Sequence, residues 1–286
     1  MAGASGPILP RWGQIYKVFI NPAILKTATF LTINDQPNST VFFVRWQLAD
    51  DSPAYYAVTT RHSIGEVVQI RFNKKGGGVD PLWFSSQDWI KHASTDVAVL
   101  PLKSGLDGYD IGYVEASDFA DDKDYLVAPT SPDTPAAHSR LGLPYGAGDE
   151  VFTVGLFEGH AGQGVAQPVA RFGHIALRPS EGETVLAEIE LGRLAPIDAL
   201  LVEMAVWKGQ SGSPVFLRVG EQSRAFRDGL ERHYLVGMIQ GFYPGTQDVK
   251  INDSDATLSP LQMGIGIVVP ARDIKEALTK TMRESQ

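Results

Sequence analysis

The chain has 286 residues, of which 43% are apolar, and it carries a formal net charge of −8. This length accommodates two small domains with a core of ordinary size. Lysine and arginine form neither a basic stripe nor a basic amphipathic helix, so we expect no nucleic-acid partner and no membrane attachment. The lack of cysteine excludes disulfides, thiolate zinc sites and cysteine nucleophiles.

No apolar run approaches the ~18 residues of a membrane helix, and the first residues show no export signal. We therefore expect a soluble protein, and the lack of cysteine favours the cytoplasm. The 29 glycines and 18 prolines follow no period, which is typical of an all-β protein with many turns.

Short β-branched apolar runs predict strands in the first part of the chain. These strands are residues 27–33, 40–48, 54–60, 67–72 and 96–102. Lys74 to Gly78 predicts a hairpin tip, because its glycines lack the Lys-Ser/Thr and helix of a phosphate-binding loop.

A polar and Pro-rich segment between residues 117 and 149 predicts a surface connection, with one strand at 124–128. Strand patterning then resumes at residues 150–157, 167–176, 184–189, 200–205, 213–219, 233–240 and 264–269, and residues 220–231 are expected to form a long hairpin loop. From Ala271 the apolar period becomes helical, which predicts a terminal helix that packs on the protein.

These elements predict an N-terminal extension, two β domains, a connection between them and a closing helix. The boundaries we expect are 1–24 for the extension, 25–120 for the first β-barrel, 121–148 for the connection, 149–270 for the second β-barrel and 271–286 for the helix.

The turn Gly-Gln-Ser-Gly-Ser-Pro at residues 209–214 precedes an apolar run. A nucleophilic serine needs a base within reach and backbone N–H groups that converge on the developing oxyanion. A glycine turn can display Ser211 while aiming the amides of Gly209 and Ser211 at one point. The alternative interpretation is an ordinary flexible turn.

His62 follows directly on the apolar strand 54–60, where it would be held rigidly. The pKa of a histidine lies near the range that a general base needs. Asp96 directly precedes the apolar strand 96–102 and needs a donor, which the imidazole of His62 would supply. The alternatives are a histidine that caps a strand and an aspartate that bonds to its own turn. The order of the three segments favours a triad of His62, Asp96 and Ser211 in a cleft between the two halves.

These segments resemble those of the chymotrypsin-like serine proteases. Residues 58–62, Val-Thr-Thr-Arg-His, resemble the family's Val-Thr-Ala-Ala-His, and residues 96–100, Asp-Val-Ala-Val-Leu, resemble Asp-Ile-Ala-Leu-Leu. Residues 209–214 resemble Gly-Asp-Ser-Gly-Gly-Pro, with a serine at 213 similar to that of bacterial glutamyl endopeptidases. Residues 264–270 and the following helix are similar to the end of cysteine-free bacterial trypsin-like and high-temperature-requirement-type proteases.

The resemblance covers residues 25–280 and implies two six-stranded Greek-key β-barrels with a C-terminal α-helix. It implies a serine endopeptidase that forms an acyl-enzyme, with Gly209 and Ser211 as the oxyanion hole. Substrate binding would involve Ala205 and a ladder formed by Gln240, Gly241 and Phe242. Gln210 stands where animal members carry an aspartate, so activation by a new N-terminus is not expected.

The partners implied are a peptide or protein substrate and a regulatory protein or stimulus, and no cofactor or metal is expected. A non-catalytic peptide-binding module on the same fold is the alternative, because fold does not fix function. An α/β-hydrolase esterase is disfavoured because position 213 is serine, and no metalloenzyme motif is present.

Overall fold

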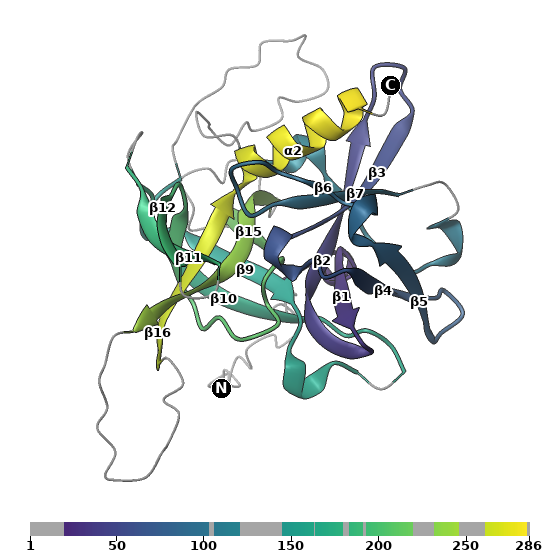
Figure 1. Cartoon of the computed structure of the whole chain (residues 1–286), viewed down its shortest axis with the longest axis horizontal. Helices are drawn as coiled ribbons and strands as arrows, with labels where there is room; N and C mark the ends of the chain where they lie inside the picture. Colours follow the sequence, from purple (N-terminus) through teal and green to yellow (C-terminus); the bar gives the residue numbers. More distant parts are fainter. Residues whose placement is uncertain are drawn as a thin grey trace, which may run out of the picture.

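A computed structural model describes residues 20–102, 106–120, 145–162, 164–179, 183–190, 193–219, 232–245 and 261–284. Within these residues the chain forms two β units and a C-terminal helix (Figure 1). Most of the predicted extension 1–24 and connection 121–148, the strand 124–128 and the loop 220–231 lie outside the described residues.

The first unit is one curled eight-stranded sheet, preceded by the short helix α1 (Pro22–Leu25). Seven strands run in the order β5-β4-β1-β2-β3-β7-β6, and β8 pairs with β2. The strands are β1 (Ala28–Ile33), β2 (Gln36–Gln47), β3 (Pro53–Thr59), β4 (Val67–Asn73), β5 (Val79–Ser85), β6 (Ile90–Lys91), β7 (Ala98–Leu102) and β8 (Val114–Glu115). The expected hairpin tip joins β4 to β5, where Gly77 and Gly78 have positive φ.

The second unit is a closed barrel of six strands in the order β10-β13-β16-β15-β14-β9. These strands are β9 (Glu150–Gly155), β10 (Val169–Leu177), β13 (Leu200–Glu203), β14 (Pro214–Val219), β15 (Arg232–Gly245) and β16 (Leu261–Pro270). A separate hairpin of β11 (Val185–Glu190) and β12 (Arg193–Ile197) is inserted between β10 and β13. Helix α2 (Ala271–Glu284) follows β16 directly.

Strand alternation divides the apolar side chains of β2 between two cores. Val41 and Phe43 face the core of the first sheet, whereas Phe42 and Val44 face a core at the seam between the two units. The second barrel contributes Phe152 and Phe216 to this seam.

Helix α2 closes the seam with the apolar face that its period predicts. Ile274, Ala277 and Leu278 are buried there, and Met282 packs against them. The expected packing role of this helix is confirmed.

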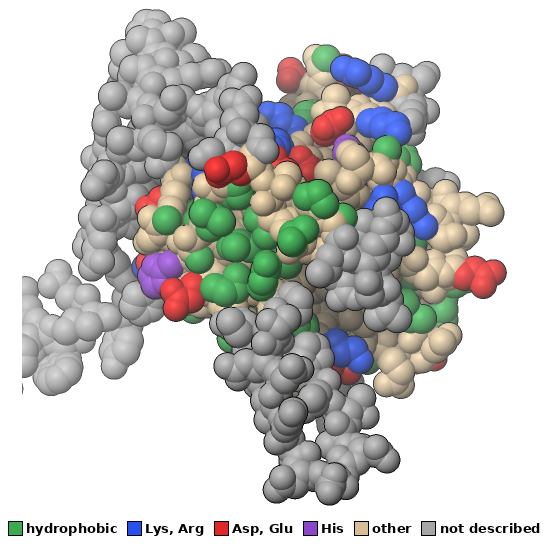
Figure 2. All heavy atoms as spheres, turned by 60° about the vertical axis from the view of Figure 1, so that its left-hand side comes forward, with side chains coloured by type: hydrophobic (Ala, Val, Ile, Leu, Met, Phe, Trp, Pro, Cys, Tyr) green, Lys and Arg blue, Asp and Glu red, His purple; other side chains and the backbone are tan. Residues whose placement is uncertain are grey.

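The arrangement confirms the expected all-β class, with two β units followed by a C-terminal helix. Of the two six-stranded barrels that we expected, the second is present as a closed barrel, whereas the first unit is one curled sheet of eight strands. Figure 2 shows hydrophobic side chains gathered on the face that carries the second barrel. None of the helices in the described ranges is both long enough and apolar enough to cross a bilayer.

Candidate functional site

His62 and Asp96 are brought together at the ends of two paired strands, β3 and β7. His62 lies in a one-turn 3-10 helix, Arg61–Ser63, that follows β3, and Asp96 lies just before β7. Asp96 Oδ2 is 2.6 Å from His62 Nδ1, and Asp96 Oδ1 accepts a hydrogen bond from the His62 backbone N–H at 3.0 Å. The carboxylate therefore holds both the backbone and the ring of the histidine.

The two partners differ in their exposure to solvent. Asp96 is 8% exposed, whereas the His62 side chain is 45% exposed. A carboxylate that accepts from Nδ1 fixes the proton on that nitrogen, so Nε2 is left as the acceptor. The pair thus presents a basic nitrogen to solvent.

The loop that carries Asp96 is braced by its own side chains. His92 Nδ1 lies 3.1 Å from the Thr95 N–H and 2.8 Å from the Thr95 hydroxyl. The Arg61 guanidinium donates to the His92 carbonyl at 3.2 Å. The His92 side chain therefore caps this loop.

Ser211 lies in a turn that Gly209 makes feasible. The Gln210 N–H donates to the Trp207 carbonyl at 3.1 Å, and Gly209 has φ +91°. A positive φ at the third position of such a turn is typical of type II and favours glycine. A β-carbon on Gly209 would lie 2.8 Å from Leu156 Cδ2, so space also excludes a side chain.

Two backbone N–H groups of this turn remain available for an external acceptor. The amides of Gln210, Gly212 and Ser213 all donate to backbone carbonyls. Within the described part of the chain, those of Gly209 and Ser211 donate to no acceptor. Because backbone N–H groups in buried segments are normally paired, two unpaired ones in a single turn are suited to binding an external oxygen.

Thr40 of β2 fixes this turn from the first unit, and it was not foreseen from the sequence. Its fully buried hydroxyl donates to the Gly209 carbonyl at 3.0 Å. The same oxygen accepts from the Leu156 N–H at 2.9 Å and from the Ser213 hydroxyl at 3.0 Å. The Thr40 N–H also donates to the Ser211 carbonyl at 2.9 Å. Three of these bonds tie the serine turn to the first sheet, and the bond from Leu156 ties the end of β9 to the same oxygen.

Thr59 connects this network to the histidine. Its hydroxyl donates to the Thr40 carbonyl at 2.6 Å, and a β-carbon on Gly212 would lie 2.4 Å from that hydroxyl. Thr59 is the last residue of β3, and His62 lies three residues further along the chain. The serine turn therefore packs against the strand end that leads into the histidine.

The Ser211 hydroxyl itself donates to the Gln240 carbonyl at 2.9 Å. The pairing of β15 with β16 skips Gln240, because Ile239 pairs with Val268 and Gly241 with Ile267. Such a bulge redirects the backbone, and here it leaves the carbonyl of Gln240 available to the serine. No hydrogen bond between Ser211 and His62 is formed among the described residues.

Three of the four predicted substrate-binding residues, Gln240, Gly241 and Phe242, lie at this bulge. Gly241 and Phe242 pair with β16 along one edge, and on the other edge their backbone has no strand partner in the described ranges. Ala205 is exposed. Met204, the residue before it, is buried in the core of the second barrel at 3% exposure.

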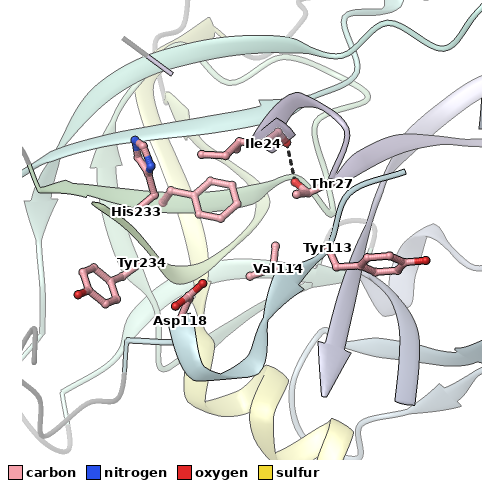
Figure 3. Close-up of a pocket in the computed structure, with 8 residues that line it drawn as sticks. Ile24, Thr27, Tyr113, Val114, Asp118, His233 and Tyr234 are labelled. Carbon is pink, nitrogen blue, oxygen red and sulfur yellow. Dashed lines mark hydrogen bonds between the residues drawn. The ribbon is translucent and has the colours of Figure 1, made fainter. Parts of the chain in front are cut away.

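A separate cavity of about 290 Å³ lies at the seam between the two units (Figure 3). It is lined by Ile24, Thr27, Tyr113, Val114, Asp118, Phe216, His233 and Tyr234. Burial, and to a lesser extent the charge of Glu115, raises the pKa of the Asp118 carboxyl. None of the predicted site residues lines this cavity.

Across the described ranges, no cluster of three or more histidine or acidic side chains could hold a metal ion.

No protein-family model matches the chain, and no curated protein matches it. Among solved structures it is similar to the Rv3671c protease of M. tuberculosis in its inactive form, with 15% identity, a TM-score of 0.45 and 90% of each chain covered. It is also similar to neuropsin, a serine protease expressed in the limbic system of mouse brain, with 11% identity, a TM-score of 0.48 and coverage of 92% of this chain and 97% of that chain.

Proposed function

We propose that the protein is a serine endopeptidase in which Ser211 is the nucleophile, His62 the general base and Asp96 the residue that orients His62. The observation that carries the proposal is the pairing of a bound His62–Asp96 couple with a serine turn that keeps two backbone N–H groups free. Each part alone has a structural explanation, but together they supply a base, a nucleophile and an oxyanion site.

The first step is the attack of Ser211 Oγ on the substrate carbonyl carbon. The hydroxyl proton moves to His62 Nε2, while the Nδ1 proton stays in the bond to Asp96, which stabilises the imidazolium. The carbonyl π electrons move to oxygen, and the resulting oxyanion accepts hydrogen bonds from the Gly209 and Ser211 amides. Each such bond is worth roughly 3–4 kcal/mol of barrier in enzymes of this kind.

Collapse of this intermediate restores the carbonyl and breaks the C–N bond. His62 gives its proton to the departing amine, which leaves an ester between the acyl group and Ser211. Water then attacks the ester with the same base, and the carboxylic acid leaves with Ser211 regenerated.

Before the first step, the Ser211 hydroxyl must leave the Gln240 carbonyl and donate its hydrogen bond to His62 instead. Its hydroxyl is bonded to the Gln240 carbonyl, and a change of χ1 between staggered rotamers redirects it towards His62. We propose that binding of a peptide along Gln240, Gly241 and Phe242 drives this exchange, since the substrate backbone competes for the same edge. A regulatory partner would act on the same bond.

A peptide-library digestion read by mass spectrometry tests the function. We expect cleavage products from the wild type and none above background from Ser211→Ala or His62→Ala, with both variants folded by circular dichroism. Peptide binding without any cleavage by the wild type would instead identify a peptide-binding module. Turnover retained after either substitution would mean that the site is assigned to the wrong residues.

A further inference from the structure

Arg171 lies between two exposed aromatic rings beside the serine turn. Its guanidinium carbon is 5.4 Å from the centre of the Phe157 ring and 6.0 Å from that of Trp207. Phe157 is 38% exposed and Trp207 is 49% exposed. Contacts of this kind hold the guanidinium plane and leave its polar edge for a ligand.

The cluster of Arg171, Phe157 and Trp207 is fixed to the serine turn through both of its aromatic residues. Trp207 is the first residue of that turn, since its carbonyl accepts from the Gln210 N–H. Phe157 directly follows Leu156, whose side chain lies against Gly209. A ligand on Arg171 therefore lies close to a peptide whose carbonyl is held by the Gly209 and Ser211 amides.

Arg171 is charged and partly desolvated, and no acidic side chain among the described residues pairs with it. Its Nε is buried with no acceptor in the same part of the chain, and burial alone lowers the pKa of the guanidinium. Glu158 and Lys208, which directly follow Phe157 and Trp207 in the chain, pair with each other at 4.0 Å. Arg45, by contrast, is paired with Glu115 at 2.7 Å.

A desolvated guanidinium with no counter-ion is costly, and the usual solution in proteins is a carboxylate that it binds through parallel N–H groups. Because Nε is closed to solvent, a ligand reaches this side chain through its terminal nitrogens. Their geometry matches the two oxygens of one carboxylate.

We propose that Arg171 binds a carboxylate of the peptide substrate next to the scissile bond, and this proposal rests on the proposed endopeptidase function. The carboxylate has two sources, an acidic side chain within a residue or two of the bond or the free C-terminus of a short substrate. The site makes the enzyme selective for acidic peptides without any charge in the pocket at Ala205.

The first experiment measures binding in the full-length Ser211→Ala protein, so that it does not depend on turnover. Peptides are used in pairs. In one set, the two members carry Glu or Gln at the same position, and this position is moved along the peptide; in the other set, the C-terminus is a free acid or an amide. Each peptide is titrated into the protein while the fluorescence of Trp207 is followed. A Trp207→Phe protein identifies the part of the signal due to that residue. We expect the carboxylate member of at least one pair to bind about fivefold or more tightly, the order expected for a charged hydrogen bond at a partly exposed site.

The matched variants are Arg171→Gln in β10 and Arg178→Gln directly after it, which remove the same charge. The Arg178 guanidinium also lies over an aromatic ring, at 4.3 Å from Tyr145, but it donates to the Tyr145 carbonyl and is remote from the serine turn. We expect Arg171→Gln to abolish the carboxylate preference and Arg178→Gln to retain it. Arg171→Lys keeps the charge but loses the two parallel N–H donors of the guanidinium, and it is expected to retain less than half of the preference. This variant replaces Arg171→Gln in the experiment if Arg171→Gln does not fold.

The same peptide pairs are then cleaved by the Ser211-containing protein, and the ratio of kcat/KM values is compared. Equal affinities within every pair, an absence of measurable binding, or a preference that survives Arg171→Gln would overturn the carboxylate site. Cleavage without a carboxylate preference refutes this site alone. A carboxylate preference in binding without any cleavage by the wild type refutes the endopeptidase function and leaves the binding site standing.

Discussion

Thr40 is the residue through which the first sheet holds the serine turn, and replacing it with valine tests whether that contact serves catalysis. Valine has nearly the same shape, so packing in β2 is kept while the hydroxyl is lost. The substitution removes three hydrogen bonds, to the Gly209 carbonyl, the Leu156 N–H and the Ser213 hydroxyl.

The expected loss of stability follows from the burial of the Thr40 hydroxyl. Thr40 is 0% exposed, so water does not replace the lost hydroxyl, and each buried group left without a partner costs about 1–3 kcal/mol. Since Ser213 can rotate to another acceptor, we expect a loss in the free energy of unfolding of roughly 2–4 kcal/mol. Without its anchor the Gly209 peptide can turn, and loss of one oxyanion donor lowers kcat by about 10²–10³.

The assay combines urea unfolding with kcat and KM for a cleavable peptide. Thr40→Ser keeps the hydroxyl, so it should retain most of kcat. Thr32→Val removes another buried hydroxyl of the first sheet, bonded to Gln69 at 2.7 Å, and should cost stability without affecting kcat. If Thr40→Val leaves kcat within twofold of the wild type, the contact is structural and our account of the turn is refuted.

Three further changes have defined outcomes. Asp96→Asn should lower kcat by about 10⁴ in peptide hydrolysis, because the amide favours the wrong tautomer of the histidine. Gly209→Ala should lower kcat at least about tenfold, because φ is +91° and the new β-carbon meets Leu156, whereas Gly148→Ala shares a φ of +93° in open space and should leave kcat unchanged. Asp118→Asn should raise the thermal midpoint at pH 7, because burial raises the pKa of that carboxyl in the folded state and its ionised form therefore destabilises the fold. As the pH falls through the raised pKa, the wild type regains this stability and the two midpoints converge.

Each of these outcomes has a result that contradicts it. Full activity of Asp96→Asn would mean that the histidine is oriented by another group. Equal losses of kcat in the two glycine variants would assign the effect to backbone strain and not to the oxyanion turn. A midpoint difference for Asp118→Asn that stays unchanged at a pH well below about 3.9, the ordinary pKa of an aspartate, would exclude ionisation as its cause.

Four strands were not predicted from the sequence, of which β6 and β8 have only two residues each and the other two share a physical feature. β5 and β12 contain Pro81 and Pro196, and proline within an apolar run argues against a strand because it cannot donate to a ladder. Both strands lie at an edge, β5 at the end of the first sheet and β12 in a two-stranded hairpin. At an edge the missing N–H faces no partner, so the proline is tolerated.

The local patterns predict His62, Asp96 and Ser211 as site residues, because each combines a strand end with a reactive side chain, and the structure brings His62 and Asp96 into contact. The residues that position the site are different. Thr40 is a polar residue within an apolar strand, and its partner Gly209 lies 169 residues further along the chain. The bulge at Gln240 depends on the register between β15 and β16. Neither contact is encoded in a short pattern, so both required the structure.

The central claim, that Ser211 is an activated nucleophile, is tested most directly by labelling with a fluorophosphonate probe and mapping the adduct by mass spectrometry. Our account predicts one adduct, on Ser211, that forms in the wild type and is lost in His62→Ala. Folded wild-type protein that does not react in the presence of a peptide or of a candidate activator, or that reacts at another residue, would contradict it.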